Sequence, residues 1–207
     1  VRLKYQALTA CANLRRKLVL DLSEYNHIIY YQIQREFRYG YSYYFLSALV
    51  RDNPVHAERA QLLQDELNQR IGFVQNMLFK LFALLYNPNE IYKAYLNFKS
   101  QASHYRALSL EVLNYTLGRD LMDVALTLLD DLPMEKRLSL ARDRAFIDDY
   151  IGEAWWSSTF IQEDIWLNRI ATWVREVNPR NEEEKTVFHL LDKVFLLKKT
   201  PLFKGFQ

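Results

Sequence analysis

Turn-forming residues are scarce in this sequence. Only 5 glycines and 5 prolines occur among 207 residues, whereas glycine alone usually makes up about 7% of a protein. Collagen, low-complexity linkers and most all-β folds are therefore excluded, because a β fold needs turn residues about every 8–12 positions. Half of the residues are hydrophobic, which provides for a sizeable core and argues against wholesale disorder.

The single cysteine, Cys11, allows no internal disulfide. It lies in a helical apolar pattern with Leu8 and Leu14, so we expect a small core residue in a reducing compartment. Long apolar runs are also missing. The most apolar stretch, residues 77–86, is shorter than the ~20 residues that span a membrane, and it predicts a buried helix end. The opening residues do not resemble a signal peptide. A cytoplasmic location is predicted, with both ends continuing into a longer protein.

Charge of one sign is not in excess. The 27 basic and 25 acidic residues leave a formal charge of +2, which predicts no general attraction to nucleic acid or to anionic membranes. No glycine-rich phosphate loop, Gly-x-Ser-x-Gly or Cys-x-x-Cys motif occurs. We therefore predict no catalytic residue, no cofactor and no metal, and we do not expect an enzyme.

Apolar residues recur at helical spacing along nearly the whole chain. The first predicted helix has an apolar face made of Leu3, Ala7, Leu8, Cys11, Leu14 and Leu18. An aromatic-rich helical stretch follows from about 22 to 49, with Gly40 as a candidate interruption. A long helix then keeps one apolar face from Leu63 to Leu85. Beyond Ile71 it is apolar on nearly all sides, so this half is expected to be central.

Caps and breaks divide the rest of the chain into short helices. Helix starts are indicated at Asn53-Pro54, Asn87-Pro88, Ser103, Asp120 and Asn181. Stops are indicated at Gly118, Leu132-Pro133 and Asn178-Pro179. About ten helices result, which predicts an all-α fold. Because the short helices follow one another closely, the pattern favours an α-solenoid or multi-helical array over a bundle.

Two stretches resemble known families. Residues 105–117 and 125–131 resemble a HEAT-like repeat, and the opening residues are similar to the same kind of helix. Residues 193–206, which include a Pro-Leu-Phe-x-Gly turn, are similar to the segment before the β-roll of cyclic-nucleotide-binding domains. The resemblance implies a HEAT-like helical domain over 1–199 and the start of a linker over 200–207.

Together these stretches resemble the middle part of a bacterial family. Its members join an ATP:ADP-antiporter-like transporter of the major-facilitator type, a cytosolic HEAT-like region and a cyclic-nucleotide-binding domain. The resemblance implies that the partners of this chain are a membrane transporter domain before it and a cyclic-nucleotide-binding domain after it. The family's phosphate-binding cassette does not occur up to Gln207, so no ligand site carries over.

Several groups of acidic and histidine residues are similar to known metal-binding motifs, but each also has a simpler structural interpretation. Glu24 and His27 form one Glu-x-x-His pair, but di-iron bundles need two. Asp130-Asp131 with Glu135, and Asp148-Asp149 with Glu153, are similar to the Mg²⁺-binding motifs of isoprenoid synthases, although the spacing differs. Capping and solvated helix faces are the simpler interpretations.

Four tryptophans raise an enzymatic alternative. Trp155, Trp156, Trp166 and Trp173, with Asp164 and Arg169, are of the residue types that HEAT-like DNA glycosylases use to hold a damaged nucleotide. No sustained basic run accompanies them, although phosphate contacts need one. Trp166 and Trp173 are seven residues apart on one helical face, which indicates core residues.

We therefore predict a non-catalytic scaffold or connector that presents a surface to its neighbouring domains or to a protein partner, and we expect no nucleic acid. The candidate interaction surface consists of the exposed members of Trp155, Trp156, Tyr41, Tyr43 and Tyr44. The alternative is a HEAT-like DNA glycosylase or another nucleic-acid-binding helical protein. A gel-shift experiment on damaged DNA separates the two.

Overall fold

The computed structural model describes residues 2–52, 57–100, 102–144, 164–176, 179 and 181–199. Within these residues the regular structure is entirely helical, which confirms the all-α class. The elements are α1 (Arg2–Lys17), the 3-10 turn η1 (Ser23–Tyr25), α2 (Asn26–Asp52), α3 (Ala57–Leu85), α4 (Pro88–Lys99), α5 (Ser103–Thr116), α6 (Arg119–Leu129), α7 (Met134–Asp143), α9 (Ile165–Arg175) and α10 (Glu182–Lys199).

The chain forms two compact units. Unit 1 comprises Val1–Ser42 and Arg70–Ile147, and unit 2 comprises Tyr43–Gln69 and Asp148–Gln207. The long helices α2 and α3 each contribute residues to both units.

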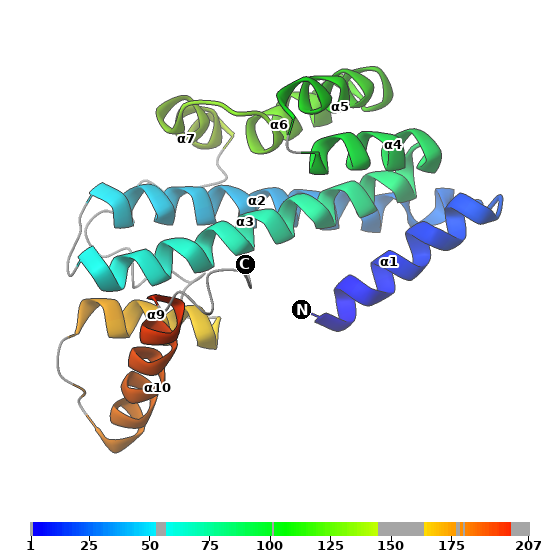
Figure 1. Ribbon diagram of the computed structural model, residues 1–207. Coiled ribbons are helices and arrows are strands. Elements are labelled where there is room, and N and C mark those ends of the chain that lie inside the picture. Colours follow the sequence, from blue (N-terminus) through cyan, green and yellow to red (C-terminus); the bar gives the residue numbers. More distant parts are fainter. Residues whose placement is uncertain are drawn as a thin grey trace. The chain divides into compact units, whose positions relative to one another are not determined.

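In unit 1 consecutive short helices contact one another. Helix α4 contacts α1 and α5, α5 contacts α6, and α6 contacts α7; α4 lies between α3 and α5 (Figure 1). The ring of Phe79 on α3 is centred 5.4 Å from the ring of Tyr95 and 5.1 Å from that of Phe98, both on α4. The half of α3 that lies in unit 1 is buried on most sides, as its apolar sequence predicts.

Gly40 permits close packing and does not interrupt a helix. Helix α2 runs through it without a break, so the sequence-based suggestion of an interruption is wrong. A Cβ atom at this position would lie 3.1 Å from both terminal methyls of Leu128 on α6 and 3.2 Å from a methyl of Val74 on α3. Glycine is therefore present because two neighbouring helices approach the backbone of α2.

The predicted helix starts of α4 and α10 are confirmed by their caps. The side chain of Asn87 accepts a hydrogen bond from the backbone N–H of Asn89 at 3.1 Å, and Pro88 occupies the first helical position. The side chain of Asn181 accepts one from the N–H of Glu184 at 2.8 Å. Both contacts satisfy N–H groups that the first helical turn leaves unpaired.

In unit 2 the core around α9 is organised by Trp173, which is fully buried. Its indole Nε1 donates a hydrogen bond to Asp192 of α10 at 3.0 Å. The guanidinium of Arg59 on α3 lies 4.7 Å from the centre of the Trp173 ring system. It also donates to the carbonyls of Trp173 and Glu176 at 3.0 and 3.1 Å. Arg59 therefore caps the carboxyl end of α9.

None of the helices in the described residues is both long and apolar enough to cross a bilayer.

Candidate functional site

Of the aromatic residues proposed from the sequence as surface anchors, the three tyrosines lie in the described part of the chain. Tyr41 and Tyr43 are buried, with 1% and 9% of their area exposed, and Tyr44 is half-buried. The hydroxyl of Tyr41 donates to the carbonyl of Val124 at 3.1 Å. Tyr41 and Tyr43 are therefore not among the exposed members of the candidate interaction surface, because a ring packed inside a unit cannot contact a partner at its surface. Trp155 and Trp156 lie outside the described residues.

The residues considered for the glycosylase alternative serve other contacts where they are described. Asp164 caps α9 by accepting hydrogen bonds from the N–H groups of Trp166 and Leu167 at 3.1 and 3.0 Å. Arg169 pairs with Glu183 at 3.2 Å. The prediction of a core position is confirmed for Trp173, but Trp166 is 36% exposed.

The acidic and histidine motifs are dispersed in the described part of the chain. Glu24 and His27 are both exposed near the start of α2. The carboxylate of Asp130 accepts a hydrogen bond from the backbone N–H of Asp131. Asp148, Asp149 and Glu153 lie outside the described residues. In the segments that the structure describes, no three side chains of His, Cys, Asp or Glu gather closely enough to hold a metal ion.

The most distinctive surface of unit 1 is the outward face of α1. Six residues at helical spacing are exposed along it, and we call this set the α1 stripe: Leu3, Ala7, Ala10, Cys11, Leu14 and Leu18. The leucines at the two ends are 79% and 54% exposed. Cys11 was expected in the core and is exposed instead. The apolar face predicted from the sequence therefore points outward, apart from Leu8, which is half-buried.

Polar and aromatic contacts explain why α1 is oriented this way. The Tyr5 ring lies 5.1 Å from that of Phe73. Lys4 forms an ion pair with the buried Glu36 at 2.6 Å. Arg15 donates to the carbonyls of Ala83 and Tyr86, at 2.9 and 3.1 Å. Rotating the apolar face inward would break these contacts and would leave Glu36 as a buried, unpaired charge.

Arg15 is positioned to cap α3. Burial lowers the pKa of its guanidinium below the ordinary value, although the nearby Asp21 acts in the opposite direction. The group stays charged at neutral pH, because arginine is always protonated there. A charged donor shared by two carbonyls at the end of a helix is a strong contact. It fixes the carboxyl end of α1 to the end of α3.

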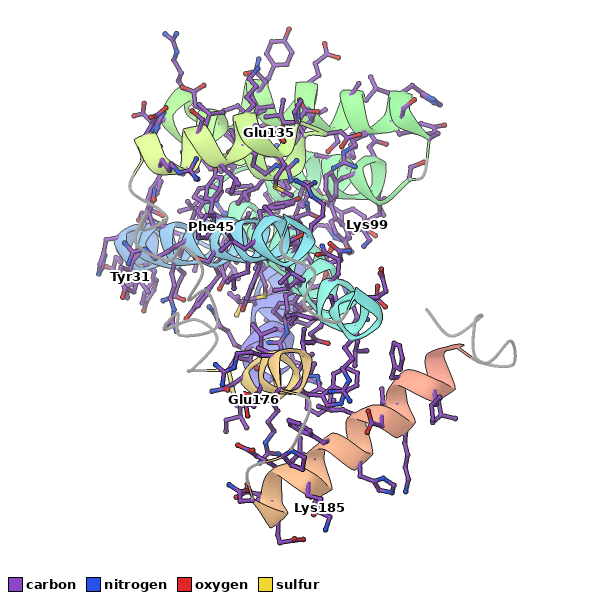
Figure 2. All side chains as sticks on the ribbon, turned by 90° about the vertical axis from the view of Figure 1, so that its left-hand side faces the viewer. Tyr31, Phe45, Lys99, Glu135, Glu176 and Lys185 are labelled. Carbon is purple, nitrogen blue, oxygen red and sulfur yellow. The ribbon has the colours of Figure 1, made fainter. Side chains whose placement is uncertain are left out.

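Further apolar residues are exposed in the segment that follows α1 and in the first turns of α2. Val19 is fully exposed, and Leu20, Tyr25 and Ile28 are also largely accessible. Tyr31 of α2 projects outward, with 66% of its area exposed (Figure 2). Exposed apolar residues are common one at a time, whereas a contiguous set is typical of an interaction site.

The charge of α1 is entirely of one sign. The helix contains five basic residues and no acidic one: Arg2, Lys4, Arg15, Arg16 and Lys17. Lys4 is neutralised by Glu36. Of the three basic residues at the carboxyl end of α1, Arg15 and Arg16 point inward and Lys17 is exposed beside the α1 stripe.

No protein-family model, no curated protein and no solved structure matches this chain. Sequence reasoning identified the apolar residues of α1 but not the direction in which they face. The absence of acidic residues does not distinguish this helix, because α9 also has none and buries its apolar face.

Proposed function

We propose that this chain is a helical interaction domain whose α1 stripe binds an acidic amphipathic helix of a protein partner. The observation that carries the proposal is the outward-facing apolar stripe, which contains no acid and has the exposed Lys17 beside it. A helix laid along such a surface buries apolar residues at intervals of three and four, as many peptide-recognition sites do.

The shape of the stripe favours a helix as the occupant. Its middle consists of the small residues Ala7, Ala10 and Cys11, and leucines lie toward both ends. Small residues allow two helix backbones to approach closely, while the leucines supply apolar area. Covering each exposed leucine contributes about 1–2 kcal/mol.

Two other occupants fit the surface less well. A second copy of the chain would bring two α1 helices together, and their basic residues would repel because neither helix carries an acid. A membrane surface would gain little from the middle of the stripe, where alanine and cysteine offer small apolar area. An acidic helix would cover the apolar stripe and would also pair with the exposed Lys17 beside it.

The scaffold or connector role follows from this surface. The consecutive contacts from α4 to α7 support a HEAT-like arrangement, as the sequence resemblance implies. That a transporter domain and a cyclic-nucleotide-binding domain adjoin this chain stays a prediction from that resemblance. The absence of catalysis also stays a prediction.

The test uses a synthetic amphipathic helix with a leucine stripe flanked by glutamates, and the same peptide with lysines in place of the glutamates. We expect the glutamate peptide to bind the full chain at least about tenfold more tightly, measured by fluorescence anisotropy. Leu14→Glu should weaken this binding by tenfold or more.

Leu108→Glu is the matched control. Leu108 on α5 is 44% exposed and Leu14 is 49% exposed, so both changes place a carboxylate on an accessible helix surface. The control should bind as the unchanged chain does. Equal binding of the two peptides would contradict the proposal. So would self-association that Leu14→Glu abolishes, or binding to anionic vesicles in preference to the glutamate peptide.

A further inference from the structure

A small cavity lies between α1, α3 and α4 in unit 1. Its volume is about 160 Å³, and its apolar walls are formed by Ala12, Phe79, Ala83 and Ile91. Phe79, Ala83 and Ile91 are buried. An apolar cavity of about 150 Å³ accommodates benzene. The space therefore suits a single six-membered ring.

Two cations line this apolar space. The guanidinium carbon of Arg16 lies 4.0 Å from the centre of the Tyr92 ring. The Nζ atom of Lys80 lies 4.3 Å from the centre of the Tyr5 ring and donates to the Tyr5 hydroxyl at 3.2 Å. Aromatic rings stabilise both cations. Among the described residues, the lining of the cavity includes two cations and no acidic side chain.

Other groups in the cavity also favour an anion. The side chain of Asn13 from α1 offers an amide donor, whereas the hydroxyl of Thr9 already donates to the carbonyl of Tyr5 at 2.7 Å. Pro88 and Ile91 lie in the first turn of α4, and the positive end of that helix dipole favours a negative charge nearby. Burial raises the pKa of Tyr95, also in the lining, so its hydroxyl stays neutral and adds no competing anion.

We propose that this cavity binds a small aromatic monocarboxylate, with its ring against Phe79 and Ile91 and its carboxylate held by Arg16 and Lys80. A single ring fills the apolar space, and the carboxylate supplies a counter-charge to the two cations. A nucleotide is larger than the apolar space of about 160 Å³ and would extend out of its open side into solvent. A neutral ring would supply no counter-charge to the two cations.

The site differs from the α1 stripe in position and chemistry. The stripe lies on the outward face of α1, whereas Thr9, Asn13 and Arg16 line the cavity from the inner side of the same helix. The bound ring would contact α1, α3 and α4 together. Hydrogen exchange of the α1 amides should therefore slow when the site is filled.

The probe is sodium benzoate, titrated into the full chain and followed by amide NMR and by thermal unfolding. Benzamide, which has nearly the same shape without the charge, is the control ligand. We expect benzoate to bind at least tenfold more tightly than benzamide, to raise the unfolding temperature, and to shift the amide signals of residues around Ile91.

Two variants test the cations separately. Lys80→Met and Arg16→Met remove one charge each while keeping most of the side-chain length, and each should weaken benzoate binding by about tenfold or more. Lys93→Met is the matched control, because Lys93 is an exposed lysine of α4 outside the cavity lining. It should bind benzoate unchanged. Equal affinity for benzoate and benzamide, or unchanged binding in a folded Lys80→Met chain, would overturn the proposal.

Discussion

Helices α1 and α9 carry the same kind of amphipathic pattern and use it in opposite ways. Helix α9 buries its apolar face, which includes Ile170, Trp173 and Val174. Helix α1 turns Leu3, Leu14 and Leu18 toward solvent. An apolar stripe therefore indicates that a helix face suits a partner. It does not indicate whether the partner belongs to the same compact unit.

Helices α1 and α9 both take part in a contact in which an arginine donates hydrogen bonds to the carbonyls at the end of a helix. Arg59 donates to carbonyls at the end of α9, and Arg15 donates to carbonyls at the end of α3. On α9 the arginine adds to a face that is already buried. On α1 the arginine is itself one of the inward-facing contacts. The orientation of α1 is thus decided by its polar side chains, because buried charges must keep their partners.

The largest effect should come from removing the buried anchor of α9. Trp173→Ala should lower the free energy of unfolding by about 3–5 kcal/mol, as truncation of a large buried aromatic residue does. It also leaves Asp192 without the indole donor. Leu14→Ala on α1 should change the free energy of unfolding by less than about 0.5 kcal/mol, because truncating an exposed side chain removes few packing contacts. Chemical denaturation measures both, and a loss of 2 kcal/mol or more for Leu14→Ala would show that the α1 stripe is covered.

A smaller effect on stability should distinguish a glycine that neighbouring side chains approach closely from one with open space around it. Gly40→Ala should lower the free energy of unfolding by about 1 kcal/mol, because overpacking against Leu128 and Val74 outweighs the gain in helix propensity. Gly72→Ala should raise it by about 0.5–1 kcal/mol, since a Cβ atom there meets nothing within 4 Å. If the two substitutions act alike, the close approach at Gly40 is not a constraint.

The smallest effect should appear at alkaline pH, on the side of unit 1 where α1 packs. Burial, followed by the hydrogen bond with Tyr30, raises the pKa of Tyr86 from 10.0 to about 12. Between these values the unfolded chain has lost a proton that the folded chain retains. The stabilisation present below pH 10 is therefore lost as the pH rises to about 12. Tyr86→Phe should flatten this part of the stability curve, whereas Tyr115→Phe, at an exposed position, should leave it unchanged.

The helices themselves could be predicted from the local sequence. Apolar spacing located α3 and its buried face, and caps such as Asn87 and Asn181 located helix starts. The prediction for Gly40 was wrong, because the sequence does not distinguish a glycine that interrupts a helix from one that allows a neighbouring helix to pack closely. The aromatic stretch around Tyr41 was identified, but its burial was not, since tyrosine suits both cores and surfaces.

The sequence by itself determined the all-α class, most helix boundaries and the amphipathic faces, because these depend on contacts between residues three or four apart. Only the tertiary structure decided which faces are covered. Lys4 meets Glu36, Arg15 meets the end of α3, and Lys80 meets Tyr5 through approaches between residues more than thirty positions apart. Those long-range contacts turn the apolar face of α1 outward and place two cations beside an apolar cavity, and no local pattern specifies them.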